Sequence, residues 1–145
     1  MATKKMQVTV KQGAGFKTEC SAGKHMLIID QPAEAGGTDA GPTPLDYQLI
    51  ALGGCVAAIG RIIASQRRLV IRGIEVALEG ELDTSRLLGK VSPNRVGFAG
   101  ITARVKIDAD LTPVEKEKLL HDIEERCPVS DNLKNITQID ITLAD

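Results

Sequence analysis

The sequence predicts a single α+β domain that spans residues 1–145. Two segments carry apolar residues at the three- and four-residue spacing of an amphipathic helix. Several shorter segments alternate between apolar and polar residues or form brief apolar runs, as strands do. The sequence contains no internal repeat, and its 145 residues match the length of one ordinary domain.

The predicted strands differ in length along the chain. Three short ones precede the first helix, and the turns QGAG and SAGK separate them. A loop rich in proline and glycine follows at residues 31–44. Two longer strands come next, and a segment with period-2 alternation closes the chain. The predicted strands are residues 6–10, 16–21, 25–30, 70–83, 100–110 and 136–144.

The two predicted helices begin alike, at TPLD (residues 43–46) and TPVE (residues 112–115). In each motif threonine stands at the N-cap, proline at the first helical position and a carboxylate at the third, which is the capping-box arrangement. The second helix is expected over residues 113–126. It ends near Cys127, because Pro128 disfavours helical geometry in the residue before it.

The first helix carries an apolar stripe of the kind that faces a core. The stripe consists of Leu45, Leu49, Leu52, Val56, Ile59 and Ile63. The other sides of the helix are also uncharged between residues 49 and 60, and a helix that is apolar all round is expected to be buried all round. Close packing against a second copy of the chain would offset the helix cost of glycine, about 1 kcal/mol per residue. The small residues expected at that contact, or next to it in the sequence, are Gly53, Gly54, Ala57 and Ala58.

Composition and charge argue against several classes of function. The net charge is −1 and only three residues are aromatic, so the chain lacks the material for neutralising phosphates or stacking on bases. No nucleic-acid partner is expected. The N-terminus lacks the apolar core of a signal peptide, and no uninterrupted apolar run reaches membrane-spanning length. We therefore expect a cytoplasmic protein without a membrane partner.

The three cysteines do not form a known metal motif. Cys20, Cys55 and Cys127 include no CxxC pair, and the spacings of His25 and His121 match no zinc-finger pattern. We expect neither a metal nor another cofactor. The three cysteines are also too few and too far apart in the sequence to form the disulfide framework of a secreted protein.

Two cysteine motifs carry a family resemblance. GPTPLDYQLIALGGC ends at Cys55, and RCPVSDNL follows with Cys127, 72 positions later. Together they resemble the OsmC/Ohr superfamily, in particular its OsmC-like members of the PxELLLAALGGC type. The resemblance implies antiparallel sheets wrapped around a long buried central helix, in an intertwined homodimer. In the same motif, Ser130 is expected to cap a short turn.

The resemblance also implies a site and a reaction. In the peroxidase branches the first cysteine attacks a small-molecule hydroperoxide and the second converts the sulfenic acid into a disulfide, which a dithiol then reduces. The matching positions here are Cys55 and Cys127. The arginine that assists these branches falls at Ala14, and their glutamate at Leu45. Asp46 is the third candidate catalytic residue, since the PxELLLAALGGC type has its carboxylate there, with plain helix capping as the alternative.

Three hypotheses about function follow. The first is a thiol-dependent peroxidase for organic hydroperoxides in an oxidative-stress response. The second is an OsmC-like redox or small-molecule-binding protein with little peroxidase activity, because the family arginine is missing. The third is a hotdog-type acyl-thioester enzyme, which also wraps a sheet around a helix. The candidate cations to replace the arginine are Lys17, Arg95, Arg104 and Arg126, and we expect none to be as well placed.

Overall fold

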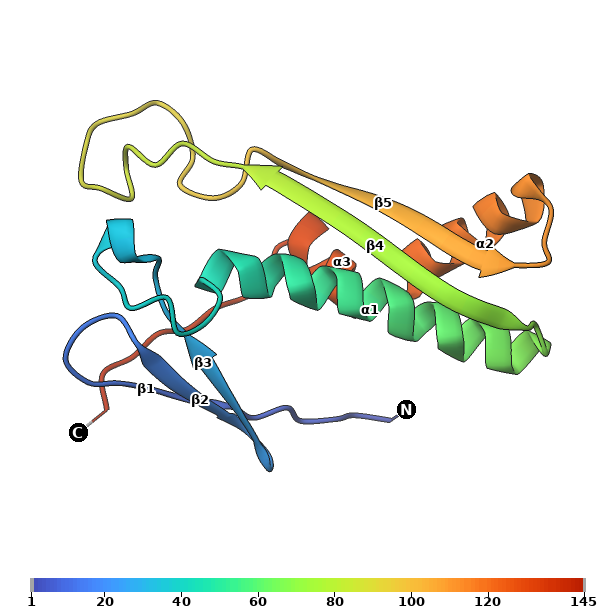
Figure 1. Ribbon diagram of the computed structural model, residues 1–145, viewed down its shortest axis with the longest axis horizontal. Helices are drawn as coiled ribbons and strands as arrows, with labels where there is room; N and C mark the ends of the chain where they lie inside the picture. Colours follow the sequence, from blue (N-terminus) through green and yellow to red (C-terminus); the bar gives the residue numbers. More distant parts are fainter. Residues whose placement is uncertain (1, 145) are drawn as a thin grey trace. The chain divides into compact units, whose positions relative to one another are not determined.

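The computed structural model describes residues 2–144, which divide into two compact units between Gln48 and Leu49. The first unit contains β1 (Thr9–Gln12), β2 (Thr18–Ala22), β3 (His25–Ile29) and the short 3₁₀ helix η1 (Ala33–Ala35). The long helix α1 (Pro44–Arg67) begins in the first unit and continues into the second. The second unit adds β4 (Ile71–Glu81), β5 (Gly100–Ala109), α2 (Pro113–Arg126) and α3 (Pro128–Lys134) (Figure 1). The fold is α+β, as predicted, with two antiparallel sheets and one long helix.

The first unit is built on a three-stranded antiparallel sheet in the order β1–β2–β3. Cys20 lies at its centre, where it pairs with Val10 on one side and Leu27 on the other. Strand β1 starts three residues later than predicted. The turn after β2 contains Gly23 at a φ of 58°, a left-handed conformation that favours glycine.

A buried carboxylate organises the loop that follows this sheet. Asp30 is completely buried and accepts hydrogen bonds from the backbone N–H groups of Gln31, Thr38 and Ala40, at 2.8, 3.2 and 3.1 Å. The Thr38 hydroxyl donates a further bond at 2.5 Å. These bonds, that of the hydroxyl above all, lower the pKa of Asp30 from 3.8 to about 2. The ionised carboxylate thus fixes the loop that leads to α1.

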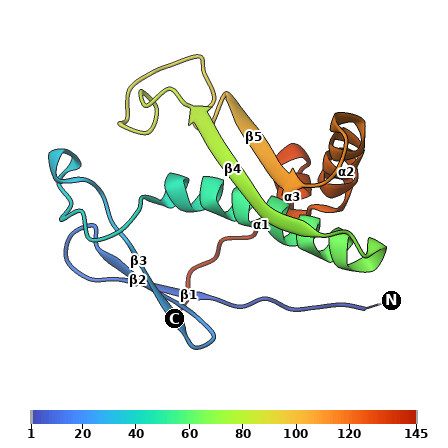
Figure 2. The same cartoon turned by 45° about the vertical axis from the view of Figure 1, so that its right-hand side comes forward.

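The second unit packs a long hairpin against two helices. Strands β4 and β5 pair antiparallel, with Ile74 opposite Ile107 and Val76 opposite Val105, and the hairpin runs alongside α1 (Figures 1 and 2). Helix α2 begins with the predicted capping box, because the Thr112 side chain accepts from the backbone of Glu115 and the Glu115 side chain accepts from Thr112. Its bounds are those predicted from the sequence.

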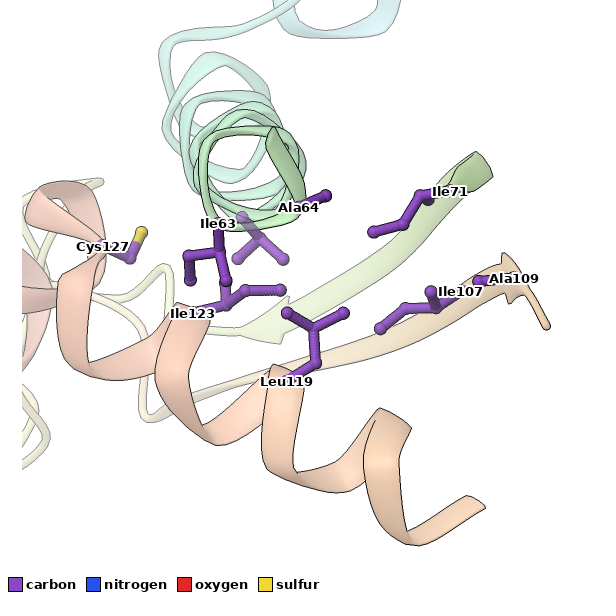
Figure 3. Packing of buried hydrophobic residues seen from close by; sticks show 9 residues of the cluster. Ile63, Ala64, Ile71, Ile107, Ala109, Leu119, Ile123 and Cys127 are labelled. Atoms are coloured by element: carbon purple, nitrogen blue, oxygen red, sulfur yellow. The ribbon is translucent and has the colours of Figure 1, made fainter. Parts of the chain in front are cut away.

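The core of this unit lies where α1, α2 and the hairpin meet. Figure 3 shows Ile63 of α1 and Leu119 and Ile123 of α2 pointing toward one another, with Ile71 and Ile107 of the hairpin beside them. Ile63 and Ile123 are completely buried. The apolar stripe predicted on α1 therefore faces the core, and α2 and the hairpin cover it.

The opposite side of α1 is exposed within the described residues, and its expected burial against a second copy of the chain stays a prediction. Ile50 and Ile62 are 55% and 45% exposed, and a Cβ added to Gly54 would meet nothing within 4 Å. Gly53 faces β4 of its own chain, since a Cβ there would lie 2.8 Å from Leu78, so the exposed Gly54 is the better placed of the two for the expected partner contact. Helix α1 is long and apolar enough to cross a membrane. The core helices of soluble proteins also meet these two criteria of length and composition.

The predicted strand at residues 136–144 is not formed. This segment is without helix or strand, and its large side chains are 73–100% exposed. They are Ile136, Ile139, Ile141 and Leu143. A strand needs a neighbour for its backbone hydrogen bonds, and within residues 2–144 this segment pairs with none. The alternation of apolar and polar residues predicts which side chains share a face, but it does not predict a neighbouring strand for the segment to pair with.

A candidate two-cysteine site

The structure brings the two predicted thiols together. The Sγ atoms of Cys55, on α1, and Cys127, at the end of α2, lie 2.9 Å apart, and the Cys127 thiol donates to the Cys55 sulfur. Both cysteines are free, and both belong to the second unit. Cys20 is also free and belongs to the first unit, on β2. The spacing of 72 residues therefore corresponds to direct contact in space.

The chain places Cys127 at a junction between two helices. Its backbone is extended, with φ −84° and ψ 106°, so that it ends α2 and also stands at the N-cap of α3. The Cys127 sulfur accepts a hydrogen bond from the backbone N–H of Ser130 at 3.4 Å. The expectation that Ser130 is itself the cap is wrong. Pro128 occupies the first helical position of α3, which makes Cys127 the cap.

Helix α2 is tied to α1 close to this junction. The Arg67 guanidinium lies 2.7 Å from the Asp122 carboxylate, and Arg126 donates to the Gln66 side chain at 2.9 Å. The first contact holds the pKa of Asp122 below its usual value. Together with the buried Ile63–Ile123 contact, these bonds fix the position of the last turn of α2 and therefore of the Cys127 sulfur.

The two sulfurs differ in exposure and environment. Cys127 is 1% exposed, whereas Cys55 is half-buried. Burial is the largest influence on Cys55 and raises its pKa, and the contact with Cys127 raises the pKa further. A hydrogen bond from the backbone N–H of Val129 acts in the opposite direction. The net result is a Cys55 thiol that is harder to ionise than an ordinary cysteine.

Two of the predicted cations are engaged with other groups. Arg104 pairs with Glu79 at 3.0 Å, and Arg126 bonds Gln66. Among the described residues of the second unit, the groups that shift the pKa of Cys55 are Cys127 and Val129, and neither is basic. Burial thus acts on this thiol without an opposing positive charge from the same unit.

Asp46 has the contacts of a capping residue. Its carboxylate accepts from the backbone N–H of Thr43 at 2.9 Å and from the Thr43 hydroxyl at 2.7 Å. Its own N–H donates to the same hydroxyl at 3.2 Å. This reciprocal arrangement satisfies donors that the start of α1 would otherwise leave unpaired.

Two contributors to the site were missed in the sequence. The Val129 backbone N–H could have been suspected from the Cys-Pro pair, since proline after a residue in extended backbone starts a helix whose next amides point back toward that residue. Gly60 is the second missed contributor, because its lack of a side chain leaves room for the Ile123 side chain of α2. No local signal distinguishes Gly60 from Gly54 in the sequence.

Solved structures of known fold resemble this one. The OsmC like protein from Mycoplasma pneumoniae has a TM-score of 0.81 and 18% identity, and the match covers 93% of this chain and 91% of that chain. The organic hydroperoxide resistance protein OsmC from Legionella pneumophila has a TM-score of 0.68 and 21% identity, with 92% of each chain covered. The organic hydroperoxide resistance protein OhrB of Bacillus subtilis has a TM-score of 0.63 and 22% identity, with 93% and 94% covered.

At these identities the similar structures establish the fold. No curated protein sequence matches the chain. A family model described as "OsmC-like protein" matches residues 37–142, a range that includes α1, the hairpin, α2 and both cysteines of the pair. The match extends over well more than half of the sequence and agrees with the fold, so the chain belongs to the OsmC-like protein family.

Proposed function

We propose that this protein is a two-cysteine redox protein that reduces organic hydroperoxides at the expense of a dithiol. The observation that carries the proposal is the 2.9 Å separation of the free Cys55 and Cys127 sulfurs. A sulfenic acid formed on one sulfur would have a second thiol within immediate reach, which is the condition for its capture as a disulfide. The acyl-thioester alternative has no use for such a pair, and the family match gives it no support.

Cys55 is the better candidate for the attacking thiol because it is half-buried, whereas Cys127 is 1% exposed. The Cys55 thiolate attacks one oxygen of the hydroperoxide, the O–O bond breaks, and the alcohol leaves with a proton. The Cys127 thiol then attacks the sulfenic sulfur, the S–O bond breaks, and water leaves as the disulfide forms. A dithiol returns two electrons and two protons, which restores both thiols. We place this cycle in the cytoplasm, where reductants keep thiols reduced.

A second candidate function is favoured by the electrostatics of Cys55. Burial raises the pKa of its thiol, and thiolate is the reactive form. The resulting protein would form the disulfide but turn over hydroperoxides slowly, as a redox protein with little peroxidase activity. Asp46 stays in the proposal only as a residue that shapes the start of α1.

The test is a thiol count before and after one equivalent of cumene hydroperoxide, followed by steady-state consumption with excess dithiol. The expected result is loss of two thiols in the native protein and in the Cys20→Ser variant. Cys55→Ser should lose none through this route, and Cys127→Ser should stop at a sulfenic acid. Rapid turnover would favour the peroxidase, and disulfide formation with slow turnover would favour the second function. An unchanged thiol count would refute both.

We also propose that the protein is a homodimer that covers the exposed side of α1. Large apolar side chains lie there, with Ile50 at 55% and Ile62 at 45% exposure, and Gly54 offers a surface without a side chain between them. The unpaired apolar segment at residues 136–144 gives further surface that a second chain would cover. Exposed apolar area of this kind is typical of association sites.

The Gly54→Leu variant tests the dimer. Nothing in the described chain lies within 4 Å of a Cβ at this position, so the substitution should leave an isolated chain folded. In a dimer packed on this side it should weaken association, because overpacking costs about 1–3 kcal/mol. Sedimentation at micromolar concentration measures the outcome. A folded, monodisperse monomer of the native protein would refute the proposal.

A further inference from the structure

Gly60 of α1 faces both strand β4 and helix α2. A Cβ built on it would be 2.6 Å from Cδ1 of Ile74 on β4 and 3.2 Å from Cδ1 of Ile123 on α2. Gly60 itself is buried. The two helices therefore meet at a position where one of them has no side chain.

The two neighbours of Gly60 differ in their freedom to move. Ile74 is only partly buried, and its Cδ1 is the far end of a flexible side chain, so it can turn away. Ile123 is completely buried in the core cluster, where close packing restricts the turning of its side chain. A methyl group at position 60 would therefore displace α2 itself through Ile123.

A displacement of α2 at Ile123 reaches the thiol pair. Ile123 lies one helical turn before Cys127, and the N–H of Cys127 still bonds to Glu124 in the last turn of α2. Moving this turn away from α1 moves the Cys127 sulfur away from Cys55. We propose that Gly60 is a positioning residue for the thiol pair, and that its missing side chain lets α2 hold Cys127 against Cys55.

The inference rests on the proposed redox role of the pair, but its test does not use hydroperoxide. The measurement is the equilibrium constant for the Cys55–Cys127 disulfide in glutathione buffers, in full-length protein that carries Cys20→Ser. This constant reports how closely the folded chain holds the two thiols. Failure of peroxide turnover with a normal constant would refute the proposed function alone.

The chain offers a matched control in the same helix. Gly53→Ala gains the same helix propensity and meets Leu78 of β4 without touching α2. This variant should keep the native constant within about twofold. Gly60→Ala should lower it by clearly more than the control does, because Ile123 must give by a few tenths of an ångström and carries the last turn of α2 with it.

Rescue identifies the route of the effect. Ile123→Val removes the Cδ1 atom at 3.2 Å, so the double variant with Gly60→Ala should recover most of the lost constant. Ile74→Val, which relieves only the contact with β4, should not. An unchanged constant in Gly60→Ala, or rescue by Ile74→Val and not by Ile123→Val, would overturn the inference. If Gly60→Ala does not fold, the double variant with Ile123→Val decides, because a folded protein with a native constant supports the inference and any other result refutes it.

Discussion

Oxidation of the thiol pair should stabilise the protein strongly. A bond between Cys55 and Cys127 closes a loop whose ends are 72 positions apart in the sequence. The chain-entropy model gives about 4.4 kcal/mol at 25 °C for a loop of this length. The sulfurs are already 2.9 Å apart. They need approach by only about 0.9 Å to reach bonding distance, so little strain is subtracted.

We therefore expect the oxidised protein to be more stable than the reduced one by about 3–4 kcal/mol. For a chain of this size that corresponds to an increase of roughly 10 °C in Tm. The assay is guanidinium unfolding of both forms at one protein concentration, because association would make the midpoint concentration-dependent. Cys20→Ser should keep the full difference, and Cys55→Ser should abolish it.

One result would refute the reasoning. The disulfide is first verified by mass and by loss of two thiols. If the oxidised protein is then no more stable than the reduced one, the loop entropy is being cancelled by strain. The backbone at α1 and at the α2–α3 junction would then have to move to form the bond, against the geometry seen for the Cys55 and Cys127 sulfurs.

Three further predictions concern pH and a helix cap. Because burial raises the pKa of Cys55, its alkylation by iodoacetamide should keep accelerating with pH and reach no plateau below about pH 9, so a plateau near neutrality would contradict this. The pKa of Asp30 is depressed from 3.8 to about 2, so its contribution to stability is complete above pH 3.8 and is lost as the pH falls toward 2. Urea midpoints of the native protein and Asp30→Asn should converge over that window, and a constant difference would argue against it. Thr112→Ala should lower the free energy of unfolding by about 1 kcal/mol through loss of the Glu115 cap, and Thr84→Ala, on an exposed loop, should not.

Local signals predicted most of the elements. Helix α2 has the bounds expected from its capping threonine, Pro113 and Pro128, because each of these acts on its immediate neighbours. The long strands β4 and β5 also appear where predicted, to within two residues. The segment at residues 136–144 shows the limit of this reasoning. Its alternation describes which side chains share a face, whereas a strand also requires a pairing partner, and that is a property of the whole fold.

The candidate site was predictable only through a resemblance. Composition and periodicity place Cys55 on a helix and Cys127 after another, but neither fixes the distance between them. The paired motifs implied that distance, and the structure gives it as 2.9 Å. The electrostatic environment of Cys55 was harder to predict from the sequence. The missing arginine was visible in the sequence, whereas the opposing hydrogen bond from Val129 depends on the turn that Pro128 starts.

The three glycines of the stretch ALGGCVAAIG explain why sequence reasoning stopped short of the geometry. In the sequence, Gly53, Gly54 and Gly60 carry the same helix cost and invite the same explanation, close approach of another backbone. In the structure each has a different neighbour. Gly53 faces β4, Gly54 faces open space, and Gly60 faces both β4 and α2. Helical periodicity fixes the direction of each position but not what lies in that direction. The distance between the two thiols depends on the one glycine that α2 contacts, so the chemistry of the pair is set by packing that only the tertiary structure shows.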